Sequence, residues 1–134
     1  MNTILVAVKG ILIKNNKMLI VRRSPFSSTG AGNWENVGGA LEFGETFETA
    51  LKREFHEEVQ LHVTVKELLY ATTFFSKENR QIVLLSFLCE CDNDDVILSD
   101  EHDQFLWATK DELVQLLPDT ILSNYKQHSI LDLF

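Results

Sequence analysis

The segment from Gly39 to Leu61, GALEFGETFETALKREFHEEVQL, constrains the fold of this chain more than any other. It contains three carboxylates, Glu54, Glu57 and Glu58, at spacings i, i+3 and i+4, which a helix places side by side. Like charges at these spacings weaken an isolated helix by about 0.2–0.5 kcal/mol per pair. A helix made from this segment therefore needs compensating positive charge, and a bound divalent cation would supply it.

The apolar residues of the same segment indicate where the carboxylates would lie. On a helix over residues 47–59 they form one arc, made by Phe47, Ala50, Leu51, Phe55 and Val59. Glu54 and Glu58 project within that arc and Glu57 lies at its border, whereas a solvated acidic face would lie opposite. Carboxylates at the edge of a buried face are costly unless they are paired or bound to metal. The pattern favours a cation site over an ordinary charged surface.

The spacing of glycine and charge in this segment, G-x5-E-x7-R-E-F-x-E-E-x-Q-L, resembles the signature box of the Nudix hydrolases. The family pattern is G-x5-E-x7-R-E-U-x-E-E-x-G-U, where U is a bulky apolar residue, and every charged position matches. Gln60 stands where the family has glycine. Since that position ends the helix, where a left-handed backbone is often needed, we expect Gln60 to cost about 1 kcal/mol or to change the helix end. The replacement of the family's glycine by Gln60 removes no metal ligand.

The resemblance implies an α+β fold, a Nudix-type α/β/α sandwich with a central mixed sheet, formed by residues 1–134 as a single domain. The sequence pattern itself predicts strands over residues 3–14, 18–23, 34–37, 63–76, 81–91 and 105–108. It predicts helices over 47–59, with Thr46 as N-cap, over 111–117 and over 120–134. Loops are expected over 24–33, 38–45 and 92–103.

The resemblance also implies a metal site. Glu54, Glu57 and Glu58, with the backbone carbonyl of Gly38, are expected to bind Mg²⁺, for which Mn²⁺ could substitute. The carboxylates suit Mg²⁺ because this ion prefers hard oxygen ligands. Glu101, in a later acidic loop, resembles a second-loop metal ligand of MutT-like enzymes, although a merely solvated loop acid fits the sequence equally well.

Other roles follow from the matched positions. In MutT-like members the residue matching Glu54 is thought to act as base or to position the water, whereas other members take the base from another loop. Arg53 is expected to pair with Glu45 and to stiffen the join between loop and helix. Gly39, beside Gly38, permits close backbone approach because it has no side chain.

Cations and aromatic side chains are needed to hold a nucleotide. Arg22 and Arg23 end a predicted strand near the box, and because side chains alternate along a strand only one can face a cleft. We favour Arg23. Aromatic side chains that could stack on a base, or simply pack in the core, are Trp34, Phe74, Phe75 and Trp107.

Composition excludes several classes of partner. The net charge is −8, from 20 acidic and 12 basic residues, which argues against binding a nucleic-acid duplex. No apolar run approaches the roughly 20 residues that cross a bilayer, and the N-terminus does not resemble a signal peptide. Cys89 and Cys91 would share one face of a strand, an unsuitable geometry for a mutual disulfide. We therefore expect a cytoplasmic protein that does not associate with membranes.

The sequence leaves three functional hypotheses. The first is Mg²⁺-dependent hydrolysis of a nucleoside triphosphate to the monophosphate and pyrophosphate. The second is hydrolysis of another nucleoside diphosphate-linked substrate, such as a nucleotide sugar. The third is a non-catalytic domain that senses nucleotides, which is disfavoured because every acid of the box is retained. A monomer and a homodimer are both compatible with the sequence.

Overall fold

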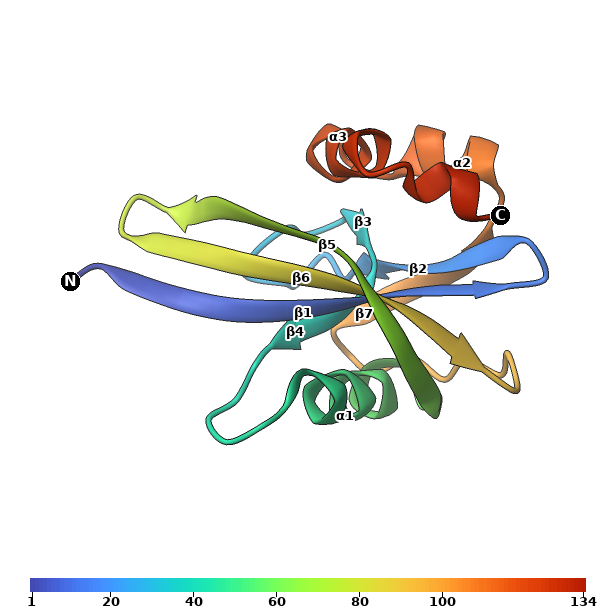
Figure 1. Ribbon diagram of the computed structural model, residues 1–134, viewed down its shortest axis with the longest axis horizontal. Helices are drawn as coiled ribbons and strands as arrows, with labels where there is room; N and C mark the ends of the chain where they lie inside the picture. Colours follow the sequence, from blue (N-terminus) through green and yellow to red (C-terminus); the bar gives the residue numbers. More distant parts are fainter.

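The computed structural model describes residues 1–134 and shows a mixed sheet between two helical layers (Figure 1). Helix α1 covers one face of the sheet, and the C-terminal helices cover part of the other. The elements, in chain order, are β1 (Thr3–Lys14), β2 (Lys17–Arg23), β3 (Trp34–Glu35), β4 (Val37–Ala40), α1 (Phe47–Val59), β5 (Val63–Lys77), β6 (Arg80–Cys91), β7 (His102–Ala108), α2 (Lys110–Leu116), α3 (Asp119–Gln127) and the 3₁₀ turn η1 (Ile130–Leu133).

Strand β1 is the centre of the sheet, whose order is β3-β2-β1-β6-β5. It runs parallel to β6 over Thr3–Leu12 and antiparallel to both β2 and β4. Strand β7 pairs with β2, and β5 forms the outer edge beside β6. The mixed sheet expected from the sequence is therefore present.

The β1–β2 hairpin turns at Asn15 and Asn16, whose φ values are 53° and 61°. Two consecutive residues with positive φ fit a type I′ turn, whose twist matches that of the flanking strands. Asparagine tolerates this conformation better than other non-glycine residues do. The turn therefore lies between the two strands that the sequence predicts over residues 3–14 and 18–23.

Two buried clusters, one on each face of the sheet, hold the layers together. The cluster under α1 includes Val8, Leu51 and Phe55, and the cluster under α2 and α3 includes Ile11 and Tyr125. Because side chains alternate along β1, Val8 and Ile11 point to opposite faces of the sheet. The sheet thus anchors the box helix on one side and the C-terminal helices on the other.

Helix α1 begins and ends where the sequence predicts. The Thr46 hydroxyl accepts a hydrogen bond from the Thr49 amide at 3.1 Å, and the Thr49 hydroxyl accepts one from the Thr46 amide at 2.9 Å. This reciprocal capping satisfies amides that the first turn leaves unpaired. At the other end Gln60 is left-handed, with φ 55° and ψ 37°. The chain therefore keeps the geometry that glycine favours, at a strain cost on the order of 1 kcal/mol.

Four sequence predictions differ from the structure. The expected loop over residues 92–103 ends earlier, because β7 begins at His102. Residues 34–37 form parts of two strands, since β3 pairs with β2 while β4 pairs with β1. The expected loop from Gly38 begins instead as strand β4, which continues to Ala40. The tail is not one helix, because it breaks at Ser129, where φ is 55°. No helix is long and apolar enough to cross a bilayer.

Candidate active site

The three acids of α1 line one ridge of the helix but differ in burial. The side chain of Glu57 is 56% exposed, that of Glu54 is 12% exposed and that of Glu58 is 2% exposed. The ridge therefore runs from solvent into the core. This matches their positions relative to the apolar arc of the helix, since Glu57 lies at its border.

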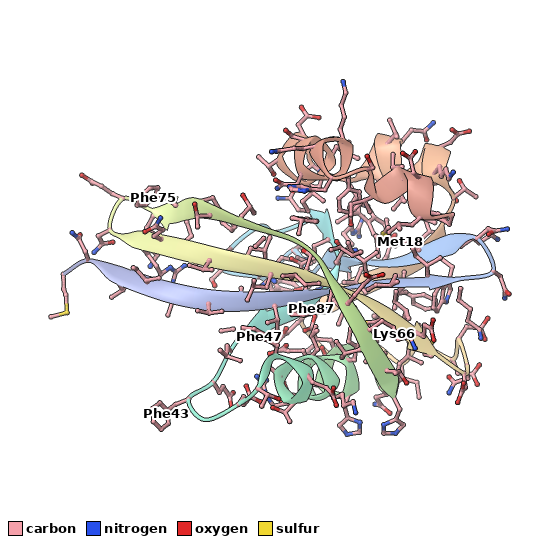
Figure 2. All side chains as sticks on the ribbon, in the orientation of Figure 1. Met18, Phe43, Phe47, Lys66, Phe75 and Phe87 are labelled. Carbon is pink, nitrogen blue, oxygen red and sulfur yellow. The ribbon has the colours of Figure 1, made fainter.

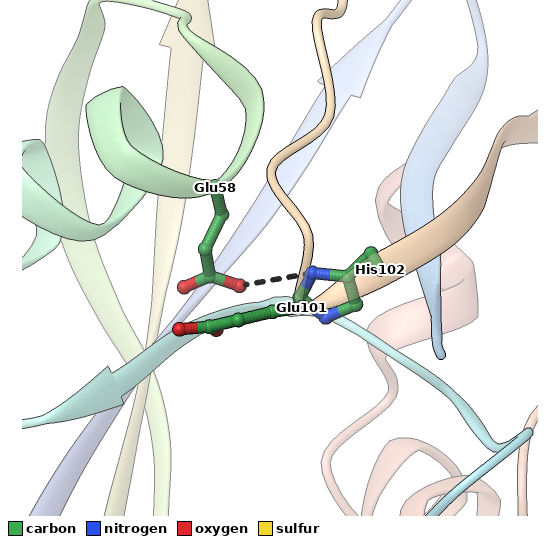
Figure 3. A group of neighbouring side chains, drawn as sticks. All are labelled: Glu58, Glu101 and His102. Atoms are coloured by element: carbon green, nitrogen blue, oxygen red, sulfur yellow. Dashed lines mark ion pairs between the residues drawn. The ribbon is translucent and has the colours of Figure 1, made fainter. Parts of the chain in front are cut away.

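Glu58 is a buried carboxylate without a hydrogen-bond donor. Neither Oε1 nor Oε2 has a hydrogen-bond partner, and the closest cationic candidate, Nδ1 of His102, lies 3.6 Å from Oε1 (Figure 3). Burial raises the pKa of Glu58 far above its ordinary value, and the neighbouring Glu54 carboxylate raises it further. An ionised carboxylate here has no hydrogen-bond donor, and the positive charge of Lys9 offsets the effect of burial only in part.

Glu101, in the segment that precedes β7, and His102, the first residue of β7, both reach Glu58. Potential ligand atoms of Glu58, Glu101 and His102 all lie within 4.8 Å of one another, and Glu101 is exposed while the other two are buried. The segment is held in place by α1 itself, because the Ser99 amide donates to the Glu58 carbonyl at 3.0 Å. The unpaired carbonyls at the end of the box helix thus position the loop that carries Glu101.

Arg53 fixes the loop that enters the helix. Its Nε donates to Glu45 Oε2 at 2.7 Å and its Nη2 donates to Glu45 Oε1 at 2.8 Å, a bidentate pair. Its Nη1 lies 2.8 Å from Glu54 Oε1, and Nη2 also donates to the Ala40 carbonyl. The hydrogen bonds from Arg53 lower the pKa of Glu45 to about 2. The Arg53–Glu45 pair expected from the resemblance is confirmed.

The two glycines of β4 allow close packing around the acids. A Cβ at Gly39 would lie 2.7 Å from Glu54 Oε1, and a Cβ at Gly38 would overlap the carbonyl oxygen of Val8. Any other residue at Gly39 would displace the Glu54 carboxylate. Gly39 therefore leaves space for the acidic ridge, whereas Gly38 permits the β1–β4 contact.

Glu35 joins the acidic ridge to a cluster of cations. Its carboxylate lies 3.3 Å from Lys9 Nζ, 3.1 Å from Arg23 Nη1 and 2.8 Å from His102 Nε2. Burial opposes its ionisation, but Lys9, His102 and Arg23 outweigh this effect and lower the pKa of Glu35 to about 2. A continuous chain of side chains, from Arg23 through Glu35 and His102, therefore ends at Glu58.

A cavity of about 590 Å³ opens beside these cations, between the sheet and the start of α3. Arg23 and Lys9 line it, as do three of the four aromatic candidates, Trp34, Phe74 and Phe75. The fourth, Trp107, packs against the cluster under α1 instead.

The two arginines at the end of β2 separate as alternation requires. Arg23 lines the cavity, whereas Arg22 makes a bidentate pair with Asp103, with its Nη2 2.7 Å from Oδ2. Both partners of that pair are only partly exposed, at 33% and 30% of their side chains. The structure thus brings Arg23 to the candidate site and leaves Arg22 in an ion pair with the neighbouring strand.

The donor set fits a divalent cation. Glu58 offers two buried oxygens that have no other partner, and Glu54 and Glu101 offer carboxylates from the same helix and the adjoining loop. Hard oxygen donors of this kind suit Mg²⁺ or Mn²⁺. A cation at this position would relieve the electrostatic cost that burial imposes on Glu58.

Comparison with known proteins identifies the family. The NUDIX domain model matches residues 4–128. The chain belongs to the Nudix family. A MutT-like protein of Streptomyces ambofaciens is 33% identical over 115 residues, which cover 85% of this chain and 70% of that protein. A CTP pyrophosphohydrolase of Escherichia coli is 31% identical over 108 residues, covering 81% and 78% of the two chains.

The fold of this Nudix protein has close structural counterparts. The crystal structure of a MutT protein from Methanosarcina mazei superposes with a TM-score of 0.88, at 20% identity, over 99% of this chain and 98% of the other. The expected α+β Nudix fold is confirmed. The protein is a Nudix hydrolase of the MutT-like branch.

Three residues of the candidate site were not predicted from the sequence. Lys9, Glu35 and His102 converge from β1, β3 and β7, which are far apart along the chain. His102 follows Glu101 directly, so its position next to a candidate ligand was a usable signal. Lys9 and Glu35 gave no such signal, because isolated charged residues are common in strands.

Proposed function

We propose that this protein is a Mg²⁺-dependent pyrophosphohydrolase that cleaves a nucleoside triphosphate to the monophosphate and pyrophosphate. The observation that carries the proposal is the buried, donor-free carboxylate of Glu58, beside Glu54 and Glu101 and linked through His102 to a cation-lined cavity. The relative named CTP pyrophosphohydrolase supports the same reaction class.

Glu54, Glu57, Glu58 and Glu101 are the side chains that would hold the metal, together with the carbonyl of Gly38. The bound metal would neutralise charge on the phosphate oxygens and lower the pKa of a coordinated water. Glu57, the most exposed acid of the ridge, is suited to a ligand position at the solvent side. Glu58, the most buried, is suited to the inner side.

We assign Glu54 the role of orienting the attacking water and accepting its proton. The Arg53 guanidinium, 2.8 Å from Glu54 Oε1, fixes the carboxylate next to Glu58. Arg53 is itself fixed by Glu45, so the three side chains form one unit. Positioning of this kind matters because phosphoryl transfer depends mainly on orientation and charge stabilisation.

The substrate is proposed to extend from the acidic ridge into the cavity. Lys9 and Arg23 supply positive charge where a polyphosphate would enter, which offsets the net charge of −8. Trp34 and Phe74 offer aromatic surface on which a base can stack. The combination of cations at one side and aromatic rings at the other fits a nucleotide.

The proposal is tested with a panel of nucleoside triphosphates, diphosphates and nucleotide sugars, with and without Mg²⁺, and with the products identified by chromatography. We expect pyrophosphate and a nucleoside monophosphate from a triphosphate only when the metal is present. A sugar phosphate and a monophosphate as the main products would favour the nucleotide-sugar hypothesis. Binding without hydrolysis of any member of the panel would contradict the catalytic proposal.

Two variants separate catalysis from folding. Glu54→Gln preserves the shape of the side chain but removes the proposed base, so we expect turnover to fall by at least 100-fold, within the range of general-base catalysis. Glu48→Gln is the matched control, because Glu48 lies on the same helix, where its side chain is exposed and paired only with Lys52. Equal loss of activity in both variants would contradict the assignment of Glu54.

A further inference from the structure

The two ring nitrogens of His102 lie in different surroundings. The side chain is buried, with 0% of it exposed. Nε2 lies 2.8 Å from Glu35 Oε2, whereas Nδ1 is buried and has no hydrogen-bond partner. Buried polar atoms in folded proteins are nearly always paired. An orphaned nitrogen at this depth therefore indicates a ligand from outside the chain.

Glu35 determines which nitrogen of this imidazole carries the proton. Lys9 Nζ and Arg23 Nη1 lie 3.3 and 3.1 Å from the Glu35 carboxylate and keep it ionised, so it accepts hydrogen bonds and has no proton to donate. Nε2 must therefore carry the proton in the contact with Glu35. In the neutral ring this leaves Nδ1 with a free lone pair. Metal-binding histidines are oriented in the same way, because their second ring N–H usually donates to a carboxylate or a carbonyl.

The lone pair of Nδ1 faces the buried carboxylate of Glu58. Nδ1 lies 3.6 Å from Glu58 Oε1, and neither oxygen of Glu58 has a hydrogen-bond partner (Figure 3). This separation is too long for a hydrogen bond between the two atoms. It fits one shared ion, because ligand atoms that are each about 2.1 Å from a metal lie about 3–4 Å apart. The potential ligand atom of Glu101 lies within 4.8 Å of those of Glu58 and His102.

Packing fixes the elements that carry these two side chains. Glu58 belongs to the buried face of α1, and the rings of Phe47 and Phe87 pack between this helix and the sheet with their centroids 5.7 Å apart (Figure 2). His102 is the first residue of β7, which pairs with β2. The imidazole and the carboxylate thus face each other from a helix and a strand, and such elements hold ligands more precisely than loops do.

We propose that Nδ1 of His102 is a ligand of the divalent cation, in addition to the carboxylates of Glu58 and Glu101. The inference rests on the metal site of the proposed function and adds a nitrogen donor to a set that otherwise consists of oxygen. Imidazole nitrogen binds transition metals such as Co²⁺ and Mn²⁺ better than it binds Mg²⁺, which prefers oxygen ligands and water. Loss of the His102 imidazole should therefore weaken the binding of Co²⁺ far more than the binding of Mg²⁺.

Electron spin echo envelope modulation of bound Mn²⁺ tests the ligand directly, without substrate or turnover. With substoichiometric Mn²⁺ added to the metal-free wild type, we expect the nitrogen modulation of a coordinated imidazole. The modulation should disappear in His102→Gln, whose amide can still donate to Glu35 but which has no ligand atom at the position of Nδ1. His56→Gln is the matched control and should keep the modulation, because His56 is an exposed histidine that stacks on His62.

Metal titrations by calorimetry give a second readout. His102→Gln should lower the affinity for Co²⁺ by about 10–100-fold and the affinity for Mg²⁺ by less than about threefold, since water replaces the imidazole readily on Mg²⁺. Equal losses for both ions would overturn the proposal, because a purely structural role of His102 predicts that result. Mn²⁺ that binds the wild type but not Glu58→Gln, and that shows no nitrogen modulation, would overturn the assignment of His102 and leave the metal site intact. Absence of any Mn²⁺ binding that depends on Glu58 would overturn the proposed function as well.

Discussion

Replacing Glu58 with glutamine should stabilise the metal-free protein while removing its function. The Glu58 side chain is 2% exposed and neither of its carboxylate oxygens has a hydrogen-bond donor. Its pKa is raised above the ordinary value of 4.5, first by burial and then by Glu54, so the folded protein binds a proton that the unfolded chain releases. Stability associated with this group is present below pH 4.5 and is lost as the pH rises.

The size of this change in unfolding free energy follows from the linkage between proton binding and folding. Above pH 4.5 the folded state loses up to about 1.4 kcal/mol of stability per pH unit for one such group, or about 3 kcal/mol by pH 7. Glutamine does not titrate, so Glu58→Gln avoids this loss, although its buried amide costs about 1–2 kcal/mol when incompletely paired. The net gain is about 1–2 kcal/mol at pH 7, which raises the melting temperature by about 3–7 °C.

The assay is thermal and chemical denaturation in EDTA from pH 4 to pH 8. The difference in unfolding free energy between Glu58→Gln and the wild type should grow with pH and favour the variant at pH 8. Saturating Mg²⁺ should raise the stability of the wild type by RT ln(1 + [Mg²⁺]/Kd), about 2.7 kcal/mol at 100 times Kd, and should raise the variant much less.

Glu57→Gln is the control for this prediction, because the Glu57 side chain is 56% exposed and the same chemical change should alter the stability of the metal-free protein very little. A Glu58→Gln variant that is less stable than the wild type at pH 8 without metal would refute the reasoning. It would show that His102 already neutralises Glu58 in the folded protein.

Three further predictions concern the residues around Glu58. Gly39→Ala should reduce turnover, because the new Cβ would lie 2.7 Å from the Glu54 carboxylate and this end of the side chain would have to move; wild-type turnover would contradict this. Arg53→Lys should reduce kcat at least tenfold with an unchanged far-ultraviolet spectrum, because lysine cannot reproduce the bidentate contact with Glu45; full activity would contradict it. Glu35→Gln should be less stable than the wild type at pH 7. Because the folded-state pKa of Glu35 is about 2, this difference in stability should disappear as the pH falls from 4.5 toward 2. A difference that persists at pH 2 would contradict the role of the cations around Glu35.

The box helix and its contacts could be predicted from the sequence because they depend on residues close together in the chain. The capping pair Thr46 and Thr49, the apolar arc and the Arg53–Glu45 pair all lie within the box. Gln60 shows the limit of such reasoning, since the sequence indicated a strained helix end but not whether the chain would keep the left-handed geometry. In the structure, Gln60 keeps the left-handed geometry.

The remainder of the site could not be predicted because it depends on contacts between distant segments. Lys9, Glu35 and His102 meet only because β1, β3 and β7 share one sheet. Strand β4 was missed because its pairing with β1, and not its own glycine-rich sequence, makes it a strand. The break in the tail at Ser129 likewise follows no local signal, since serine has no general preference for positive φ.

The central claim is that the acidic ridge of α1 binds a divalent cation beside the cavity. Anomalous diffraction from crystals soaked in Mn²⁺ tests this most directly. We expect an anomalous peak within coordination distance of Glu58 and Glu54, and loss of that peak in Glu58→Gln. A peak only at surface acids such as Asp94 and Asp95, with no density near Glu58, would contradict the account.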